Sequence, residues 1–262
     1  MIRLLTEHDR ETVLNYLYQD PAYNIFIIGD IEAFGFNQTF QRIYAEFDNG
    51  RLLSVLLRYR DSAIYYADTL RFNKAYLDIF EKDPFSYISG KTKLMNLIKP
   101  HLISYENFHT YFCEATTFNK EWETDPIIKY MTTKEDAYKI YDLIATVEEF
   151  SVFQQDKEAY ADAKMKSMAM GMTLYLEDCN RAISTVATTA ETKQNAMVVA
   201  VATHKDARNK GYASRLMQAL MYEYLIKKQK HLCLFYDNPN AGKIYQRLGF
   251  KPIGTWDMYK KQ

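Results

Sequence analysis

Short apolar stretches alternate along the chain with segments in which apolar side chains recur every three or four positions. The first pattern predicts strands and the second predicts amphipathic helices. In the first half the predicted strands are Ile2–Leu5, Arg42–Phe47, Leu52–Tyr59, Ala63–Ala67 and Phe85–Ile88. The predicted helices there are Arg10–Leu17, Tyr23–Phe34, Lys74–Glu81 and Thr92–Ile98. Asp48-Asn49-Gly50 separates two of the strands and is a strong hairpin signal.

The second half repeats a similar order of elements. Its predicted strands are Ile127–Met131, Thr173–Glu177, Ala182–Thr189, Ala196–Thr203, Leu232–Tyr236 and Ile253–Tyr259. Its predicted helices are Ala137–Thr146, Lys157–Met170, Gly211–Lys228 and Asn240–Leu248, the first of them preceded by Thr133 at N-cap spacing. Between the halves, Tyr111–Thr124 is polar and is predicted to be irregular, ending at Asp125-Pro126. We therefore predict two domains, residues 1–120 and 125–262, each an α/β or α+β sandwich with a mixed central sheet flanked by helices.

Composition narrows the class of protein. The 262 residues include 33 basic and 33 acidic side chains, 48% apolar and 25% charged residues, which is ordinary for a globular chain. A balanced charge does not favour a nucleic-acid partner. The three cysteines form no CxxC pair and the five histidines show no ligand spacing, so neither disulfides nor a metal are expected. The N-terminus lacks signal-peptide features and no apolar run reaches membrane-spanning length, so we expect a cytoplasmic protein without a membrane partner.

The segment Val199–Ser214 carries the clearest chemical signal. A buried strand ends, a short basic loop with Arg208 and Lys210 follows, and a long helix begins at Gly211. The start of a helix leaves backbone N–H groups unpaired and carries partial positive charge, and small residues let an anion approach them. This construction suits a pyrophosphate.

The loop resembles the acetyl-CoA loop of the GNAT acetyltransferases, in which Gln/Arg-x-x-Gly-x-Gly/Ala stands here as Arg208-x-x-Gly211-x-Ala213. A second motif of that family follows at the expected distance, as Asn238-x-x-Ala241-x-x-x-Tyr245-x-x-x-Gly249-Phe250. The resemblance is strong over residues 127–261 and weaker before them. It implies a tandem GNAT-like protein, with a degenerate first domain and a catalytic second domain.

The resemblance also implies roles for individual residues. Acetyl-CoA is the expected acyl donor, held along its pantetheine arm by the end of a strand, at its pyrophosphate by the loop, and at the start of the following helix. The residues matched to these roles are Val201, Ala202, Thr203, Arg208, Asn209, Lys210, Gly211, Tyr212, Ala213, Ser214, Asn238 and Asn240. Tyr245 would protonate the departing CoA thiolate, and an amine would attack the thioester directly, without a covalent intermediate.

The general base and the acceptor are less defined. Glu148 and Glu149, between the first two helices of the second domain, are the candidate bases, and Glu191 is a further one; each could equally be a surface acid. The expected acceptor is an amine, more in keeping with a small molecule than a protein, and the chain could be a monomer or a homodimer. Two other functions stay open: transfer of a longer acyl group, as in glycine N-acyltransferase-like proteins, and CoA binding without turnover.

Two other segments resemble nucleotide sites only superficially. Ser89-Gly90-Lys91-Thr92 looks like part of a P-loop, but that motif needs a glycine where Phe85 stands. In the first half, the strand-to-helix junction Asp68–Asn73 has no glycine, and Asp68 would repel phosphate. We therefore expect the first domain to have lost cofactor binding.

Overall fold

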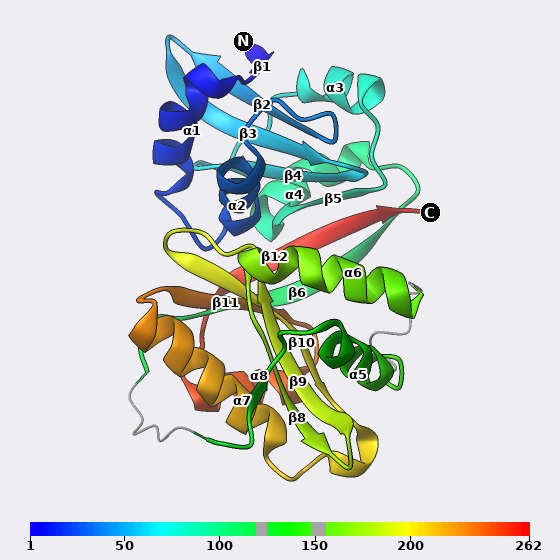
Figure 1. Ribbon diagram of the computed structural model, residues 1–262. Helices are drawn as coiled ribbons and strands as arrows, with labels where there is room; N and C mark the ends of the chain where they lie inside the picture. Colours follow the sequence, from blue (N-terminus) through cyan, green and yellow to red (C-terminus); the bar gives the residue numbers. More distant parts are fainter. Residues whose placement is uncertain (119–124, 148–155) are drawn as a thin grey trace. The chain divides into compact units, whose positions relative to one another are not determined.

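The computed structural model describes residues 1–118, 125–147 and 156–262, which divide into two compact units (Figure 1). The first unit comprises Met1–Phe112, Phe235–Asp237 and Pro252–Gln262, and the second comprises Cys113–Leu234 and Asn238–Lys251. The last residues of the chain therefore belong with the first unit, whereas the sequence pattern had placed them in a second domain at 125–262. The predicted boundary at residues 120–125 lies largely outside the described residues.

The first unit follows the predicted order of elements as far as the helix Thr92–Ile98, and a further strand after that helix was not predicted. Its elements are β1 (Ile2–Leu4), α1 (Arg10–Leu17), α2 (Ile25–Phe34), β2 (Gln41–Asp48), β3 (Arg51–Tyr59), β4 (Ser62–Ala67), α3 (Tyr76–Lys82), β5 (Tyr87–Lys91), α4 (Thr92–Ile98) and β6 (Tyr105–Ala115), which runs on into the second unit. Asn49 and Gly50 both have positive φ and join β2 to β3 in a two-residue turn, so the predicted hairpin is confirmed. The strand order is β1-β2-β3-β4-β5-β12-β6.

The strand β12 (Lys251–Lys261) completes the sheet of the first unit from the far end of the chain. It pairs antiparallel with β5, with Trp256 opposite Lys91 and Lys260 opposite Tyr87. Trp256, Asp257 and Tyr259 are buried. The C-terminal strand is therefore an internal strand of this sheet rather than an edge.

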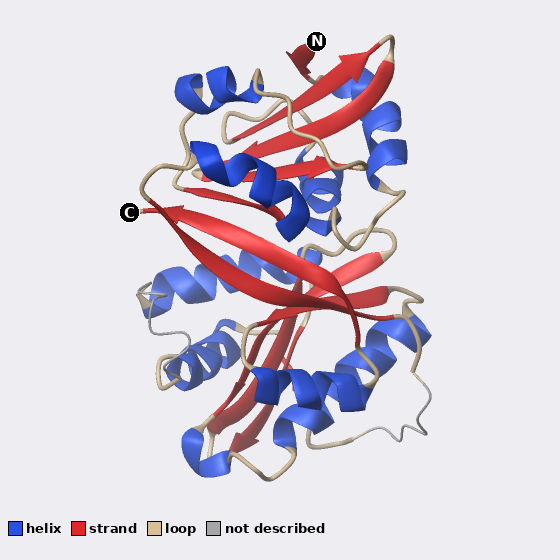
Figure 2. Ribbon diagram, turned by 180° about the vertical axis from the view of Figure 1, so that it is seen from behind, coloured by secondary structure: helices blue, strands red, loops and turns tan. Residues whose placement is uncertain are grey.

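The second unit is built around a sheet in the order β11-β10-β9-β8-β7. Its elements are β7 (Lys129–Tyr130), α5 (Lys134–Ile144), α6 (Lys157–Ser167), β8 (Thr173–Asp178), β9 (Arg181–Thr189), β10 (Asn195–Thr203), α7 (Tyr212–Met221), a π-helical segment η6 (Tyr222–Lys227), β11 (His231–Tyr236) and α8 (Pro239–Leu248). Neighbouring strands are antiparallel except for the parallel pair β10 and β11. Helices pack against the strands of each unit (Figure 2), and α5 and α7 both contact β9.

Local sequence signals explain where α5 begins. The Thr133 hydroxyl accepts a hydrogen bond from the Asp136 backbone N–H at 3.2 Å, and the Asp136 carboxylate accepts one from the Thr133 N–H at 2.9 Å. This reciprocal capping box satisfies donors that the helix cannot pair itself. The helix then packs its apolar side chains, including Ile140 and Leu143, in a core with Tyr175 and Ala182.

Three predicted elements need correction. Tyr111–Thr124 was expected to be irregular, but Tyr111–Ala115 continues β6, whose neighbour β12 comes from the other end of the chain. The predicted strand Ile127–Met131 is reduced to Lys129–Tyr130. The helix predicted at Gly211–Lys228 is α-helical only to Met221 and then widens into η6. Among the described residues, no helix is both long enough and apolar enough to cross a bilayer.

Candidate acyl-CoA site

A β-bulge distorts β10 near its C-terminal end. Val199 lies opposite Ala187 of β9, but Ala202 lies opposite Thr185, so three steps along β10 match two along β9. Ala200, inside this bulge, has a φ of +53°, which is uncommon for a residue with a side chain. The bulge makes the end of β10 depart from regular pairing at the point where the predicted cofactor residues begin.

The other edge of β10 loses its partner just before the bulge. The parallel pairing with β11 covers Asn195, Ala196 and Met197 and then ends, although β10 continues to Thr203 and β11 to Tyr236. Val201 and Thr203 are half-buried and Ala202 is buried. The backbone of this last part of β10 is therefore available to pair with an extended ligand, as an added strand would.

The loop after β10 turns sharply into α7. The Arg208 Nε donates to the Thr203 carbonyl oxygen at 3.2 Å, which ties the loop to the end of the strand. Asn209 and Gly211 have positive φ, +64° and +80°. A Cβ at Gly211 would meet no atom within 4 Å, so the backbone angle, and not lack of space, favours glycine here.

The first turn of α7 has no side-chain cap. Gly211 occupies the N-cap position and has no side chain, so the N-cap residue accepts no side-chain hydrogen bond from the N–H groups that follow. Arg208, Asn209 and Lys210 are exposed, while Tyr212, Ala213 and Ser214 open the helix and are half-buried. Uncapped N–H groups at a helix start, beside two cations, form a site that favours an anion.

The second predicted motif forms α8. The Asn238 Oδ1 accepts from the Asn240 N–H at 2.9 Å, so Asn238 caps the helix, and Gly249 ends it with a φ of +111°. Both asparagines are exposed. The Arg247 Nη2 donates to the Ser214 Oγ at 3.4 Å, which brings α8 beside the start of α7. The two motifs, far apart in the sequence, therefore meet in one region of the unit.

Tyr245 lies within α8 and is half-buried, with its ring 6.1 Å from that of Phe250. Burial raises the pKa of Tyr245 to about 12. The phenol is therefore protonated throughout the physiological range, as a proton donor must be before it acts.

The candidate bases have different outcomes. Glu148 and Glu149 lie outside the described residues. Burial acts to raise the pKa of Glu191, but hydrogen bonds from Lys228, Lys230 and Tyr224 outweigh it and lower the pKa. The Lys230 Nζ lies 2.7 Å and the Tyr224 hydroxyl 2.8 Å from this carboxylate. The ionised Glu191 side chain, just after β9, is therefore a hub that connects to η6 and to the residue before β11. In the described part of the chain, no group of three or more metal-ligating side chains comes together.

A match to a known family agrees with this geometry. The family described as "Acetyltransferase (GNAT) domain" matches residues 171–252, from the start of β8 into β12. The C-terminal half of this chain carries a GNAT acetyltransferase domain. No curated protein matches the sequence significantly.

Solved structures extend the GNAT likeness to the whole chain. A Drosophila protein is 12% identical with a TM-score of 0.72, covering 100% of this chain and 98% of that one. A tandem GNAT protein from the clavulanic acid biosynthesis pathway is 12% identical with a TM-score of 0.60, covering 99% and 97%. A GNAT from Sphaerobacter thermophilus is 15% identical with a TM-score of 0.61, covering 100% and 95%. At such identities the likeness shows the fold, and it confirms the predicted tandem GNAT architecture.

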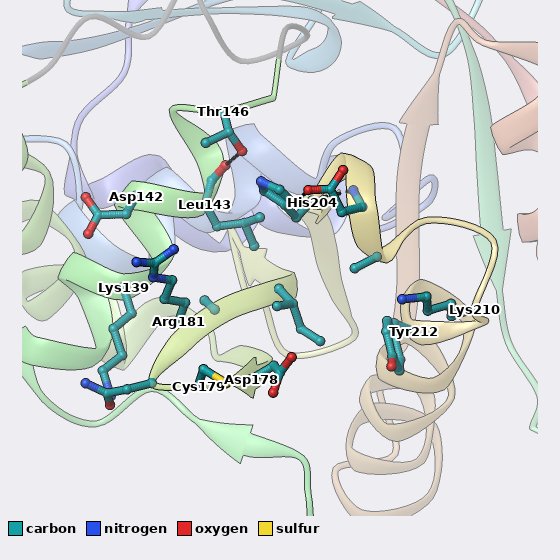
Figure 3. Close-up of a pocket in the computed structure, with 15 residues that line it drawn as sticks. Lys139, Asp142, Leu143, Thr146, Asp178, Cys179, Arg181, His204, Lys210 and Tyr212 are labelled. Atoms are coloured by element: carbon teal, nitrogen blue, oxygen red, sulfur yellow. Dashed lines mark hydrogen bonds and ion pairs between the residues drawn. The ribbon is translucent and has the colours of Figure 1, made fainter.

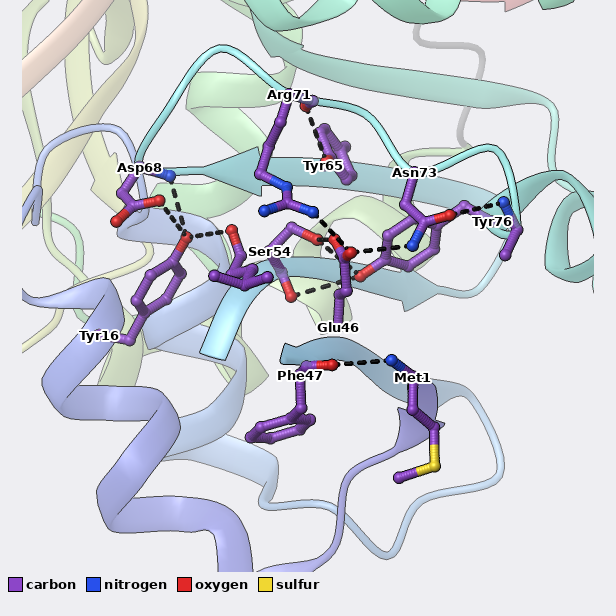
Figure 4. A network of polar contacts seen from close by, with 12 residues as sticks. Met1, Tyr16, Glu46, Phe47, Ser54, Tyr65, Asp68, Arg71, Asn73 and Tyr76 are labelled. Carbon is purple, nitrogen blue, oxygen red and sulfur yellow. Dashed lines mark hydrogen bonds and ion pairs between the residues drawn. The ribbon is translucent and has the colours of Figure 1, made fainter. Parts of the chain in front are cut away.

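In the first unit, a buried acid holds the strand-to-helix junction Asp68–Asn73 in place (Figure 4). Glu46 is 4% exposed, and its carboxylate accepts from the Arg71 Nη2 at 2.7 Å and from the Asn73 Nδ2 at 2.8 Å. The Tyr65 hydroxyl also donates to the Arg71 carbonyl oxygen. The junction is therefore held by internal hydrogen bonds, and its cation is already neutralised.

In the first unit, side chains also fill the space between β4 and β5 beyond the point where their parallel pairing ends. That pairing ends at Ile64 opposite Ser89. Beyond it, the Lys91 Nζ forms an ion pair with Asp20 and lies 4.3 Å from the ring centroid of Tyr23 and 5.0 Å from that of Tyr66. Side chains of the first unit thus link β4 to β5 beyond their pairing. In the second unit, by contrast, the edge of β10 beyond its pairing with β11 is left unpaired.

The bulge at Ala200 in the candidate site has no signal in the local sequence. Ala200 lies in an apolar run, and nothing in its sequence neighbourhood distinguishes it from other residues of a buried strand. No glycine or proline marks the bulge, so local sequence carried no signal for it.

Proposed function

We propose that the second unit binds acetyl-CoA and transfers its acetyl group to the amine of a small-molecule acceptor. The proposal depends on two backbone regions of the second unit. One is the edge of β10 beyond Met197, where the pairing with β11 has ended, and the other is the start of α7 at Gly211, which has no side-chain cap. Together they offer hydrogen bonds to an extended amide-containing arm and to a pyrophosphate, the two parts of CoA that such backbone groups recognise.

Each residue has a defined task in this proposal. The backbone of Val201 and Thr203 pairs with the pantetheine arm, while the N–H groups of residues 209–214 hold the pyrophosphate with Lys210 nearby. Bound acetyl-CoA supplies the thioester carbon that the acceptor amine attacks. The backbone near Val201 polarises the thioester carbonyl, and the Tyr245 hydroxyl gives its proton to the departing thiolate.

The protonated Tyr245 phenol supports the direct attack of an amine on the thioester, because a donor to the departing thiolate must carry a proton. In the first unit, Glu46 and Lys91 already occupy the corresponding positions with internal contacts. We therefore propose that the first unit has no cofactor of its own.

Calorimetric titration with acetyl-CoA tests the cofactor site. We expect micromolar binding with one site per chain, and loss of at least tenfold in affinity for Gly211→Glu, which adds a negative charge to the anion site. Gly50→Glu is a matched control, because Gly50 has a φ of +81° against +80° at Gly211. A Cβ at Gly50 would also meet no atom within 4 Å. Both variants carry the same backbone strain, but only Gly211→Glu should lose acetyl-CoA.

The outcomes separate the possible functions. An equal loss of acetyl-CoA affinity in both variants, or no acetyl-CoA binding by the folded wild type, would contradict the proposed cofactor site. Binding without turnover against a panel of amines would favour a CoA-binding module, and faster transfer from longer acyl-CoAs would favour an acyltransferase of the glycine N-acyltransferase-like kind.

A further inference from the structure

A second concave site lies within the second unit, next to the loop that precedes α7 (Figure 3). It is a cavity of about 740 Å³. Three segments line it: the end of α5, the turn between β8 and β9 with the start of β9, and the stretch from His204 to Tyr212. Its size lies in the range that small-molecule sites occupy.

The inner surface of this cavity is apolar. Leu143 of α5, Ala182 of β9 and Ala207 of the loop are 2%, 6% and 7% exposed, and Ile183 lies beside them. These side chains offer a floor for a flat or aliphatic group, because removing apolar surface from water is favourable.

Some of the charged groups around the floor are already neutralised. The Lys139 Nζ lies 3.1 Å from the Glu177 Oε2 and 2.6 Å from the Asn180 Oδ1. Asp142 pairs with Lys157 at 2.6 Å. These groups shape the wall but have little remaining charge to offer a ligand.

Two cations and two acids on the wall have no permanently charged partner among the described residues. Within residues 1–118, 125–147 and 156–262, neither Arg181 nor Lys210 forms an ion pair or a side-chain hydrogen bond, and Asp178 likewise has none. Arg181 lies at the start of β9 and Lys210 on the facing loop (Figure 3). Asp206 also lines the wall, and its carboxylate lies 3.7 Å from the His204 Nδ1, so the unpaired charges of the wall balance. The Arg181 guanidinium remains free to bind a planar or tetrahedral anion in a forked manner.

We propose that this cavity binds an anionic small molecule of the mononucleotide class, with its ring on the Leu143–Ala182 floor and its phosphate at Arg181. The combination favours a ligand with both features, because a bare phosphate would leave the apolar floor unused and a purely apolar ligand would make no contact with the Arg181 charge. The site is centred on Arg181, outside the proposed acetyl-CoA site, although Lys210 and Tyr212 border both.

Calorimetric titration of the full chain with AMP tests the proposal, and Arg181→Gln is the decisive variant because Arg181 has no part in the proposed acetyl-CoA site. We expect AMP to bind the wild type, and Arg181→Gln to weaken AMP at least about tenfold, the loss expected for one hydrogen bond to a charged group. The affinity for acetyl-CoA should stay unchanged in the same variant. Lys193→Gln, an exposed lysine of the second unit that does not line the cavity, is the matched control and should change neither.

Three results would overturn the proposal. The wild type could fail to bind AMP, Arg181→Gln could bind it as tightly as the wild type, or inorganic phosphate could bind as tightly as AMP and so show that the floor contributes nothing. Because acetyl-CoA is titrated against the same proteins, failure of the proposed acetyltransferase function would appear separately, as absent acetyl-CoA binding with AMP binding retained.

Discussion

Positive φ angles shape the backbone of the proposed cofactor site at Ala200 in β10 and at Gly211, the N-cap of α7. At Gly211 this angle is without cost, whereas at Ala200 a left-handed conformation costs about 1–2 kcal/mol. Such strain persists only where the surrounding structure enforces it, and here β9 does so by pairing on both sides of the bulge. The strained residue thus lies where β10 has already left β11 and its backbone is free for a ligand.

Tyr245→Phe tests the proton donor. The variant loses only a hydroxyl, so we expect kcat to fall about 100-fold while the affinity for acetyl-CoA stays the same. Since burial raises the pKa of Tyr245 to about 12, the phenol stays protonated up to about pH 10, and the ratio of wild-type to variant kcat should not change with pH below that value. Steady-state kinetics at several pH values, with an amine that the wild type acetylates, measure this ratio.

Tyr160→Phe is the control for Tyr245→Phe. Tyr160 is also a tyrosine of the second unit in a helix, and its buried hydroxyl has no hydrogen-bond partner in the described part of the chain. Removing that hydroxyl should leave kcat unchanged. A similar fall in both variants would show that the rate responds to tyrosine packing and not to a proton from Tyr245.

At the scale of elements, the N-terminus of α5 contributes stability that depends on pH. Burial acts to raise the pKa of Asp136, but hydrogen bonds from Thr132, Thr133 and Tyr175 outweigh it and lower the pKa to about 2. A carboxyl group with a lowered pKa stabilises the folded state above its unfolded value, about 4, and loses that contribution as the pH falls toward 2.

Thr133→Ala removes one half of the capping box. We expect the free energy of unfolding at pH 7 to fall by about 1 kcal/mol. Thr132→Ala is the matched control, because Thr132 contributes its backbone N–H to Asp136 and not its hydroxyl. Denaturant unfolding of both variants at pH 7 measures the difference, and equal stability of the two would contradict the importance of this cap.

Elements with a local cause were predictable from the sequence. The Asn49-Gly50 turn, the Thr133 cap and the loop before α7 each depend on residues adjacent in the chain, and the structure has all three. The end of β6 was not predictable, because its neighbour β12 lies about 140 residues later and polar side chains obscured the strand pattern. The Glu191 hub was missed for the same reason, since its three partners come from η6 and the residues after it.

The candidate site was predictable only in part. Its loop could be located because anion binding needs small residues at the start of a helix, which is visible in the sequence. Its second motif could be located only by its resemblance to the GNAT family. The bulge at Ala200 and the separation of β10 from β11 depend on register between strands, which no single segment encodes. The cavity beside Arg181 required three segments to come together, and no motif joins them.

At the scale of the whole molecule, β12 makes the first unit depend on the end of the chain. Deleting residues 252–262 removes buried Trp256 and Tyr259 and leaves β5 without its antiparallel neighbour. We expect the first unit to lose its cooperative unfolding, because each buried aromatic side chain contributes about 1.5–3 kcal/mol. Amide hydrogen exchange should show rapid exchange throughout β3, β4 and β5 in the truncated protein.

Point variants within β12 separate packing from chain length. Trp256→Ala should destabilise the first unit by about 3–5 kcal/mol, whereas Met258→Ala, at a position 37% exposed, should have a small effect. If the truncated protein kept the exchange protection of the full chain, β12 would be dispensable for the first unit.

The place of β12 also sets an order of events during synthesis. Domains of a nascent chain usually fold from the N-terminus onward as they leave the ribosome. Here the pairing of Lys91 with Trp256 spans 165 residues, so the part of the sheet made first waits for the part made last. At ~5–20 residues per second, the interval between Phe112 and Gln262 is roughly 8–30 s, during which β5 and β6 lack the strand that separates them. Over that interval the nascent first unit has unpaired strand edges, the condition in which chaperones protect a chain from aggregation.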